Sequence, residues 1–234
     1  MPALPLVFMV LWAILLFGGL VLGRTDAGRT RRMPLWTRIG SSAVLVVAAW
    51  LWLGTDSLPI AYTLLIAIGM SLGLAGDLFM ARLLPVPNYV LGGMAAFGLG
   101  HVAYIAAFLT LGANLALSAG AALPAWRIWI VIGAAGWYLA VYHGQKATVL
   151  HWAALPYALL LASTAGAASG LAIQVPGLWP LALGGALFLT SDLILAARLF
   201  NGAWFPLIED VVWLTYGPAQ ALIVYGVHLW RLSP

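Results

Sequence analysis

Apolar residues fill most of the sequence in runs of roughly 20 residues, and short polar or charged stretches separate these runs. A membrane-spanning helix needs about 20 such residues, because the hydrocarbon core is about 30 Å thick. The regular alternation that marks a membrane β-barrel is absent. The pattern therefore predicts an all-α membrane protein with eight transmembrane helices. We expect these helices at about residues 2–23, 39–54, 58–80, 89–111, 124–142, 149–171, 178–197 and 210–230.

Composition supports the membrane interpretation. The chain has 234 residues, of which 64% are hydrophobic and 7% are charged, whereas a soluble domain carries about 25% charged residues. We therefore treat residues 1–234 as a single polytopic membrane domain. The sequence contains no cysteine, which excludes disulfides, thiol catalysis and cysteine-ligated metals. The net charge of +4 lies mostly in loops beside the spans, where it sets topology and does not indicate nucleic-acid binding.

The basic residues predict the orientation of the chain. The loop at residues 24–38 holds five arginines and one aspartate. If this loop is cytoplasmic, eight lysines and arginines lie on the cytoplasmic side and two on the other. The positive-inside rule then places both termini outside the cytoplasm. We expect a multi-pass integral protein of a bacterial inner membrane.

Two aspartates interrupt the apolar pattern inside predicted spans. Asp77 precedes Arg82 by five residues, and Asp192 precedes Arg198 by six. These offsets correspond to about 7.5 and 9 Å along a helix, so both carboxylates are expected at similar depth, somewhat inside the cytoplasmic interface. An ionised side chain at the bilayer centre costs about 2.5–3.5 kcal/mol on insertion scales, which makes such residues functional candidates.

The two aspartates also suggest an internal relationship. They lie 115 residues apart, and each falls in the third helix of a possible four-helix half. The halves would be 1–111 and 124–234, related as a parallel repeat. Because the matching stretch is short, duplication and chance similarity remain equal alternatives.

A close pair of carboxylates has a specific chemical use. If Asp77 and Asp192 meet across the bundle, they cannot both ionise easily, and the pair holds one proton near neutral pH. One aspartate is then a general acid, and the other is a general base or stabilises a cation. The alternative is structural, with each aspartate snorkelling to the interface or pairing with a nearby arginine.

Four other polar residues are candidates for the same site. His101 and Tyr104 share one face of a predicted helix, as do Tyr216 and Gln220. The alternative for each is a hydrogen bond between helices. No HExxH and no His/Glu pair at metal-ligand spacing occurs, so we predict no metal. No GxSxG, P-loop or glycine-rich dinucleotide motif is present, and we predict no cofactor.

Four ordered motifs resemble those of the YhhN-like lysoplasmalogenase family. They match its Gly-Asp, His-x-x-Tyr, Phe-x-x-Ser-Asp and Tyr-x-x-x-Gln signatures, and the resemblance covers about residues 30–228. The family often has Lys-Pro near the start of its second span, where this chain has Thr37-Arg38-Ile39. The motifs are Leu72-Gly-Leu-Ala-Gly-Asp77, Phe97-Gly-Leu-Gly-His-Val-Ala-Tyr104, Gly185-Ala-Leu-Phe-Leu-Thr-Ser-Asp192 and Tyr216-Gly-Pro-Ala-Gln220.

The resemblance implies eight membrane helices and hydrolysis of the sn-1 vinyl ether bond of lysoplasmalogens. The products would be a fatty aldehyde and glycerophosphoethanolamine or glycerophosphocholine. The family's candidate catalytic carboxylates correspond to Asp77 and Asp192. Its other polar residues, expected to contact the substrate, correspond to His101, Tyr104, Ser191, Tyr216 and Gln220.

Two other function classes remain open at this point. A proton-coupled transporter of a small solute or lipid would also use membrane carboxylates, and transporters often have half-chain repeats. A scaffold or lipid-binding protein would use the same residues without turnover. For the enzyme, the expected partners are a lysophospholipid substrate and the surrounding membrane lipid, with no nucleic acid.

Overall fold

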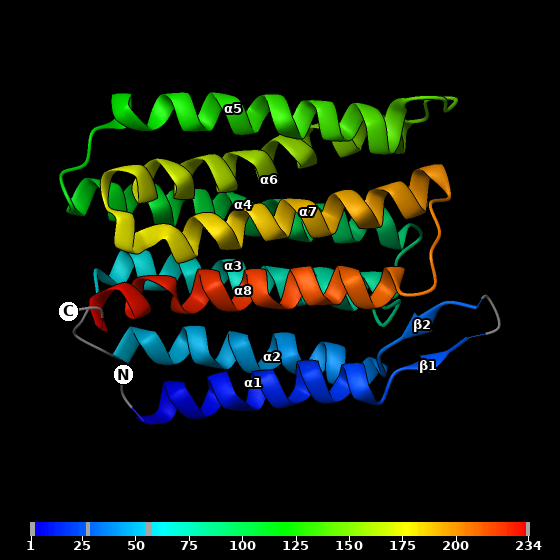
Figure 1. The fold of residues 1–234 in the computed structure, drawn as a ribbon, viewed down its shortest axis with the longest axis horizontal. Helices are drawn as coiled ribbons and strands as arrows, with labels where there is room; N and C mark the ends of the chain where they lie inside the picture. Colours follow the sequence, from blue (N-terminus) through cyan, green and yellow to red (C-terminus); the bar gives the residue numbers. More distant parts are fainter. Residues whose placement is uncertain (1–2, 27–28, 55–57, 233–234) are drawn as a thin grey trace.

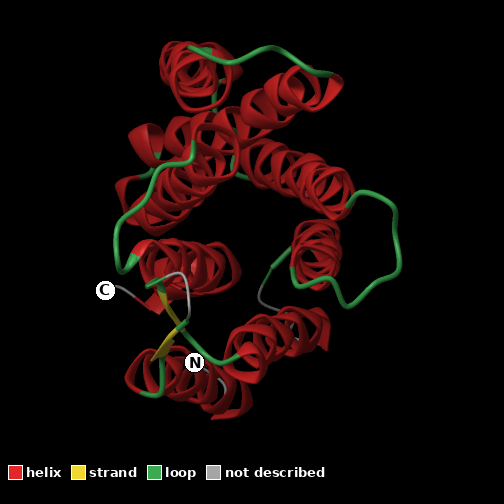
Figure 2. Ribbon diagram, turned by 90° about the vertical axis from the view of Figure 1, so that its right-hand side faces the viewer, coloured by secondary structure: helices red, strands yellow, loops and turns green. Residues whose placement is uncertain are grey.

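The computed structural model describes residues 3–26, 29–54 and 58–232. In this part of the chain, eight long helices lie side by side along a common direction (Figure 1). Figure 2 shows the bundle from the end that carries a small β-hairpin, with the helices seen nearly end-on. The long helices are α1 (Ala3–Val21), α2 (Leu35–Leu51), α3 (Ile60–Met80), α4 (Tyr89–Asn114), α5 (Ala119–Trp137), α6 (Val149–Gln174), α7 (Trp179–Asn201) and α8 (Ile208–Leu232). The shorter elements are β1 (Arg24–Thr25), β2 (Arg31–Arg32), the 3₁₀ turns η1 (Trp52–Gly54) and η3 (Pro176–Leu178), and the π-helical turn η2 (Tyr138–Tyr142).

The all-helical fold and its membrane character are confirmed. Six helices, α1 and α3 to α7, are long and apolar enough to cross a membrane, so the chain is a multi-pass integral membrane protein. In a bilayer, a helix satisfies all its backbone hydrogen bonds internally, which explains why apolar runs of this length become helices. Helix α2 is apolar but has only 17 residues, and the first turn of α8 contains two acidic residues, Glu209 and Asp210. The number of eight membrane spans therefore stays a prediction, as does the orientation of the termini.

Several helix ends differ from the predicted boundaries. The predicted loop at residues 112–123 is much shorter, because α4 continues to Asn114 and α5 begins at Ala119. The Ser118 side chain accepts a hydrogen bond from the Ala121 amide and so caps the start of α5. Helix α7 runs past the predicted end at residue 197 and ends at Asn201. It stops there because Gly202 adopts a left-handed conformation with φ of 66°.

The predicted basic loop at residues 24–38 contains a hairpin that the sequence pattern did not predict, and its last residues, from Leu35, already belong to α2. Strands β1 and β2 pair antiparallel, with Arg24 opposite Arg32. The Arg31 amide donates to the Pro206 carbonyl over 2.8 Å, and the Arg31 guanidinium pairs with Asp210 at the start of α8. The hairpin is thus fastened to one end of the bundle.

Small residues allow neighbouring helices to approach closely. A Cβ added to Gly100 of α4 would lie 3.1 Å from the Gly69 carbonyl oxygen of α3. A Cβ on Gly185 of α7 would lie 2.7 Å from the Ala165 Cα of α6. Close backbone contact through glycine and alanine is typical of membrane helix packing. These contacts hold α3 and α7, which carry the two aspartates, in fixed positions.

Gly185→Ala is expected to destabilise the protein by about 1–3 kcal/mol, because the new methyl group meets α6 backbone and forces the helices apart. Gly18→Ala is the matched control, since a Cβ at Gly18 of α1 has no atom within 4 Å. Thermal unfolding in detergent measures both. Equal melting temperatures for the two variants would contradict the close packing of α6 and α7.

The helix contacts repeat after four helices. Each of four helix contacts has a counterpart in which both helices are shifted by four. The contact α1–α2 corresponds to α5–α6, α3–α4 to α7–α8, α2–α3 to α6–α7, and α4–α6 to α8–α2. A duplicated four-helix half would produce this arrangement. The relationship between the halves 1–111 and 124–234 nevertheless stays a prediction, because shared contacts show arrangement and not ancestry.

Candidate active site

A cavity of about 560 Å³ opens at the hairpin end of the bundle. Helices α2, α3, α4, α7 and α8 and strand β2 contribute its walls. Both predicted catalytic aspartates, Asp77 of α3 and Asp192 of α7, line this cavity, and so do Ser191 and Tyr216. Its remaining charged residues are Arg32, Arg38, Arg82, Arg198 and Glu209. The fold therefore brings two carboxylates from distant parts of the sequence to one space.

Asp77 lies in a hydrogen-bonded cluster that joins three helices. Its side chain is buried, and the Ser42 hydroxyl of α2 donates to Asp77 Oδ2 over 2.6 Å. Gln220 of α8 donates through Nε2 to the Tyr216 oxygen over 2.6 Å. Tyr216 accepts this hydrogen bond, so its own O–H can still donate. The Tyr216 hydroxyl lies within hydrogen-bonding reach of the Asp77 carboxylate. The Ser42 oxygen is also 3.3 Å from Gln220 Oε1. This cluster fixes the orientation of the Asp77 carboxylate.

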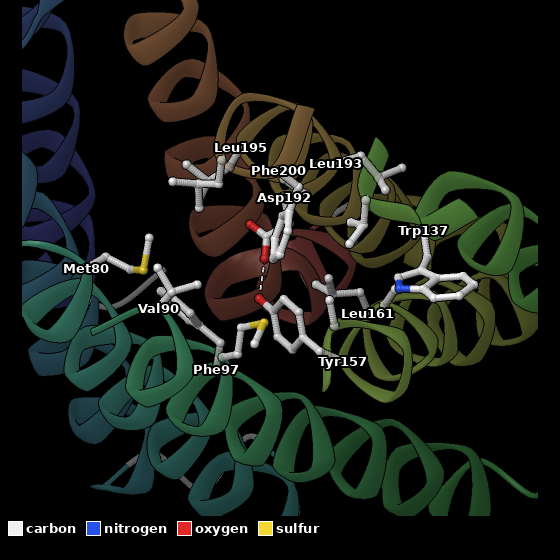
Figure 3. A pocket seen from close by; sticks show the side chains of 16 residues that line it. Met80, Val90, Phe97, Trp137, Tyr157, Leu161, Asp192, Leu193, Leu195 and Phe200 are labelled. Carbon is white, nitrogen blue, oxygen red and sulfur yellow. Dashed lines mark hydrogen bonds between the residues drawn. The ribbon is translucent and has the colours of Figure 1, made fainter. Parts of the chain in front are cut away.

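Asp192 has a different environment. The Tyr157 hydroxyl of α6 donates to Asp192 Oδ2, as Figure 3 shows. Asp192 also borders a second, much smaller cavity of about 50 Å³, whose wall is almost entirely apolar. The wall of this cavity comes from α4, α6 and α7, the last residues of α3 and α5, and the η2 turn. Met80, Trp137 and Leu161 are among its side chains (Figure 3). Asp192 thus borders both the large cavity, which contains the other charged groups, and the small apolar one.

His101 and Tyr104 occupy the core of the bundle. Both are almost fully buried, and neither lines the two cavities. His101 Nδ1 lies 2.9 Å from the Thr164 hydroxyl of α6, and its ring contacts that of Phe188 at 4.5 Å. A Cβ on Gly69 would lie 2.4 Å from the Tyr104 ring. These positions agree with a helix-packing role, and a role in substrate binding stays a prediction.

Ser191 and Gln220 are placed differently from one another. The Ser191 hydroxyl donates to the Val212 carbonyl over 2.9 Å, so its hydrogen holds α7 to α8 even though the residue borders the large cavity. Gln220 lies behind the cavity wall and contacts Tyr216 and Ser42. Its expected contact with substrate is therefore indirect in this arrangement.

Two residues of the site, Ser42 and Tyr157, were not predicted. Ser42 has a weak signal in the sequence, because Ser41 and Ser42 are adjacent hydroxyls in an apolar helix. Tyr157 has none, because it precedes Asp192 by 35 residues and lies on another helix. Both become visible only when the helices are packed.

Some of the charged side chains that line the cavity form ion pairs, and others contact aromatic rings instead. Glu209 forms ion pairs with Arg198 and, at 3.6 Å, with Arg32. Burial lowers the pKa of the Arg32 guanidinium, although arginine keeps its charge in proteins. The Arg82 guanidinium lies 4.2 Å from the Tyr89 ring centre, and that of Arg38 lies 5.7 Å from the Trp213 ring centre. Within the described residues, no group of three metal-ligand side chains occurs.

The comparisons with known proteins identify a family and nothing narrower. No curated protein and no solved structure matches the chain. The model of the YhhN family matches residues 34–227. This range covers most of the chain and includes Ser42, Asp77, Tyr157, Asp192 and Gln220. The sequence resemblance to this family is therefore confirmed, and the chain belongs to the YhhN family.

Proposed function

We propose that the protein is an intramembrane hydrolase that cleaves the sn-1 vinyl ether bond of lysoplasmalogens. The observation that carries the proposal is the position of Asp77 and Asp192 in one cavity, with Asp192 between its polar space and an apolar pocket. A lysoplasmalogen matches this arrangement, because its vinyl ether bond lies between an apolar chain and a polar headgroup. The products are a fatty aldehyde and glycerophosphoethanolamine or glycerophosphocholine.

Vinyl ether hydrolysis begins with a proton transfer to carbon. The protonated acid gives its proton to the β-carbon of the double bond, and the α-carbon becomes an oxocarbenium ion stabilised by the ether oxygen. Glycoside hydrolysis passes through a related cation between two carboxyl groups. A positioned acid–base group contributes about 10²–10⁴-fold in rate. The reaction therefore suits a pair of carboxyl groups.

We assign the roles of the two aspartates within the proposal from the surroundings of each. The β-carbon belongs to the alkenyl chain, and Asp192 borders the small apolar pocket, whose wall suits the first carbons of this chain. We therefore take Asp192 as the acid. Asp77 lies in the polar cluster with Ser42 and Tyr216, which suits a base that binds water. Asp77 takes a proton from water as the water oxygen adds to the α-carbon.

The resulting hemiacetal then breaks down with the same two groups. Its hydroxyl gives a proton to the Asp192 carboxylate, and Asp77 returns its proton to the ether oxygen as the carbon–oxygen bond breaks. One water is consumed, the aldehyde and the glycerol hydroxyl are released, and both aspartates regain their starting states. No other reactant is needed.

Aldehyde release from purified protein in detergent tests the proposal. We expect aldehyde release from lysoplasmenylethanolamine or lysoplasmenylcholine, and no fatty acid release from the corresponding lysophospholipid with an ester at sn-1. The protonation step requires a double bond beside the ether oxygen, which the ester lacks. A folded protein that releases no aldehyde from either headgroup class would contradict the proposed function. Transport that appears only in sealed vesicles with a proton gradient would instead favour the transporter.

A further inference from the structure

Two arginines that line the large cavity, Arg38 and Arg82, have no carboxylate partner among the described residues. The carboxylate of Glu209 is already shared by Arg198 and Arg32, and that of Asp210 pairs with Arg31. Every ion pair found in the described part of the chain uses one of these two acids. The cavity thus contains two guanidinium groups that are available to an anion.

Arg38 is the stronger observation of the two. Its side chain is 8% exposed, and its Nε atom is buried without a hydrogen-bond partner in the described structure. A buried charge is costly unless it is paired. The flat Trp213 ring, 5.7 Å away, gives it only a weak electrostatic contact. Because the residue lines the cavity, an anion bound there is expected to balance its charge.

Arg82 lies in the turn that ends helix α3. Helix α3 ends at Met80, and Arg82 has a left-handed φ of 58°. Glycine is the common residue at such a helix end, because a side chain is disfavoured there. The arginine instead extends over the Tyr89 ring at 4.2 Å and lines the same cavity as Arg38. The backbone turn is explained by the helix end itself, where the Arg82 and Leu83 amides donate to the Phe79 and Leu78 carbonyls over 2.9 and 3.0 Å. What the turn leaves for a ligand is the Arg82 side chain, which lines the cavity without an ion-pair partner among the described residues.

We propose that Arg38 and Arg82 bind the phosphate group of the lipid headgroup and thereby make the site specific for phosphate-bearing substrates. Arginine binds phosphate well because its planar donors match two phosphate oxygens. The identity of the lipid rests on the proposed function, whereas the phosphate site rests on these two residues. The phosphate lies at the polar end of the cavity, and the alkenyl chain extends past Asp192 toward the apolar pocket.

A second explanation for Arg38 is that it only balances the charge of Asp77. In the structure the two side chains form no ion pair, since none with N–O separation within 4.0 Å is found for Arg38. Balancing Asp77 also does not account for Arg82, which lines the same cavity and forms no ion pair within the described residues. The two explanations differ in one measurable result, which is whether a phosphate compound binds.

Binding is measured first, without turnover. Titration calorimetry with the full chain in detergent uses glycerophosphoethanolamine and, separately, inorganic phosphate. We expect Arg38→Gln and Arg82→Gln each to weaken binding of glycerophosphoethanolamine by about tenfold to hundredfold, as for loss of a charged hydrogen bond. Arg127→Gln is the control, because Arg127 is an exposed arginine of α5 away from the cavity. Arg82 is exposed, so its variant is expected to fold even if that of Arg38 does not.

Kinetics separate the phosphate site from the proposed reaction. For a lysoplasmalogen, Arg82→Gln is expected to raise KM more than it lowers kcat. For a neutral 1-alkenylglycerol, the wild type and Arg82→Gln are expected to have equal, low kcat/KM, because the phosphate is absent. Arg38→Lys is expected to restore part of the binding that Arg38→Gln loses, since it keeps the charge.

The outcomes are distinct for the two proposals. Unchanged binding of glycerophosphoethanolamine in both glutamine variants would overturn the phosphate site, even if aldehyde is released. Arginine-dependent binding with no aldehyde release would keep the phosphate site and overturn the proposed reaction. Equal weakening by Arg127→Gln would show a general charge effect and would also overturn the site. Binding of inorganic phosphate but not of glycerophosphoethanolamine would assign the site to free phosphate and not to a lipid.

Discussion

Asp192→Asn is expected to lower kcat for aldehyde release by about 10²–10⁴-fold, the contribution of a positioned general acid. Asparagine has nearly the same shape as aspartate but has no acidic proton to give to the β-carbon. The Tyr157 hydroxyl can still donate to the side-chain oxygen of asparagine, so the local packing is expected to persist. Single-turnover measurements in detergent, which isolate the chemical step from product release, test this expectation.

Tyr157→Phe is the matched control for this variant. It removes the hydroxyl that contacts Asp192 and leaves the carboxyl group itself in place. We expect a smaller loss, about tenfold, because orientation is impaired while the proton donor remains. If Asp192→Asn is folded and retains activity within tenfold of the wild type, Asp192 is not the acid. If Tyr157→Phe is the more severe variant, the tyrosine and not the aspartate is the group that transfers the proton.

Asp77→Asn is expected to have the second-largest effect, also about 10²-fold or more in kcat. The amide cannot take a proton from water, so the addition of water to the oxocarbenium ion slows. The amide would also place an NH₂ group near the hydroxyl donors of Ser42 and Tyr216 or rotate away from them. Aldehyde release measured beside that of Asp192→Asn tests the prediction.

Ser42→Ala controls for the disturbance of the cluster around Asp77. It removes the 2.6 Å hydrogen bond to the carboxylate but keeps the base. The expected loss of activity is about tenfold, in line with the loss of one charged hydrogen bond. A Ser42→Ala variant as inactive as Asp77→Asn would mean that the cluster is needed mainly for folding. Thermal unfolding of both variants in detergent separates these cases.

The helices of this protein could be predicted because their cause is local. An apolar run of about 20 residues must satisfy its backbone within itself in a bilayer, and a helix is the structure that does so. The eight apolar stretches of the sequence become the eight long helices of the described structure. The ends were less predictable, because they depend on single residues such as Ser118 and Gly202. The hairpin was missed because each strand has only two residues.

The carboxylates were also visible in the sequence, because charge inside an apolar run is rare for a physical reason. Helical periodicity correctly placed His101 and Tyr104 on one face, where their rings lie 5.7 Å apart. It could not tell whether that face meets a cavity or a neighbouring helix. The structure shows that His101 faces Thr164 and Phe188 in the core, because the rotation of α4 is set by its packing on α3 and α6.

The sequence by itself therefore determined the membrane class, the helices and the two acidic positions, since each depends on the transfer of residues from water to lipid. Only the tertiary structure decided which groups surround each acid. Ser42 meets Asp77 and Tyr157 meets Asp192 across 35 residues of chain in each case, and Gln220 comes from 178 residues beyond Ser42. Such contacts depend on the rotation and crossing angle of whole helices. The packing of small residues between helices sets both of these, and no local sequence pattern does.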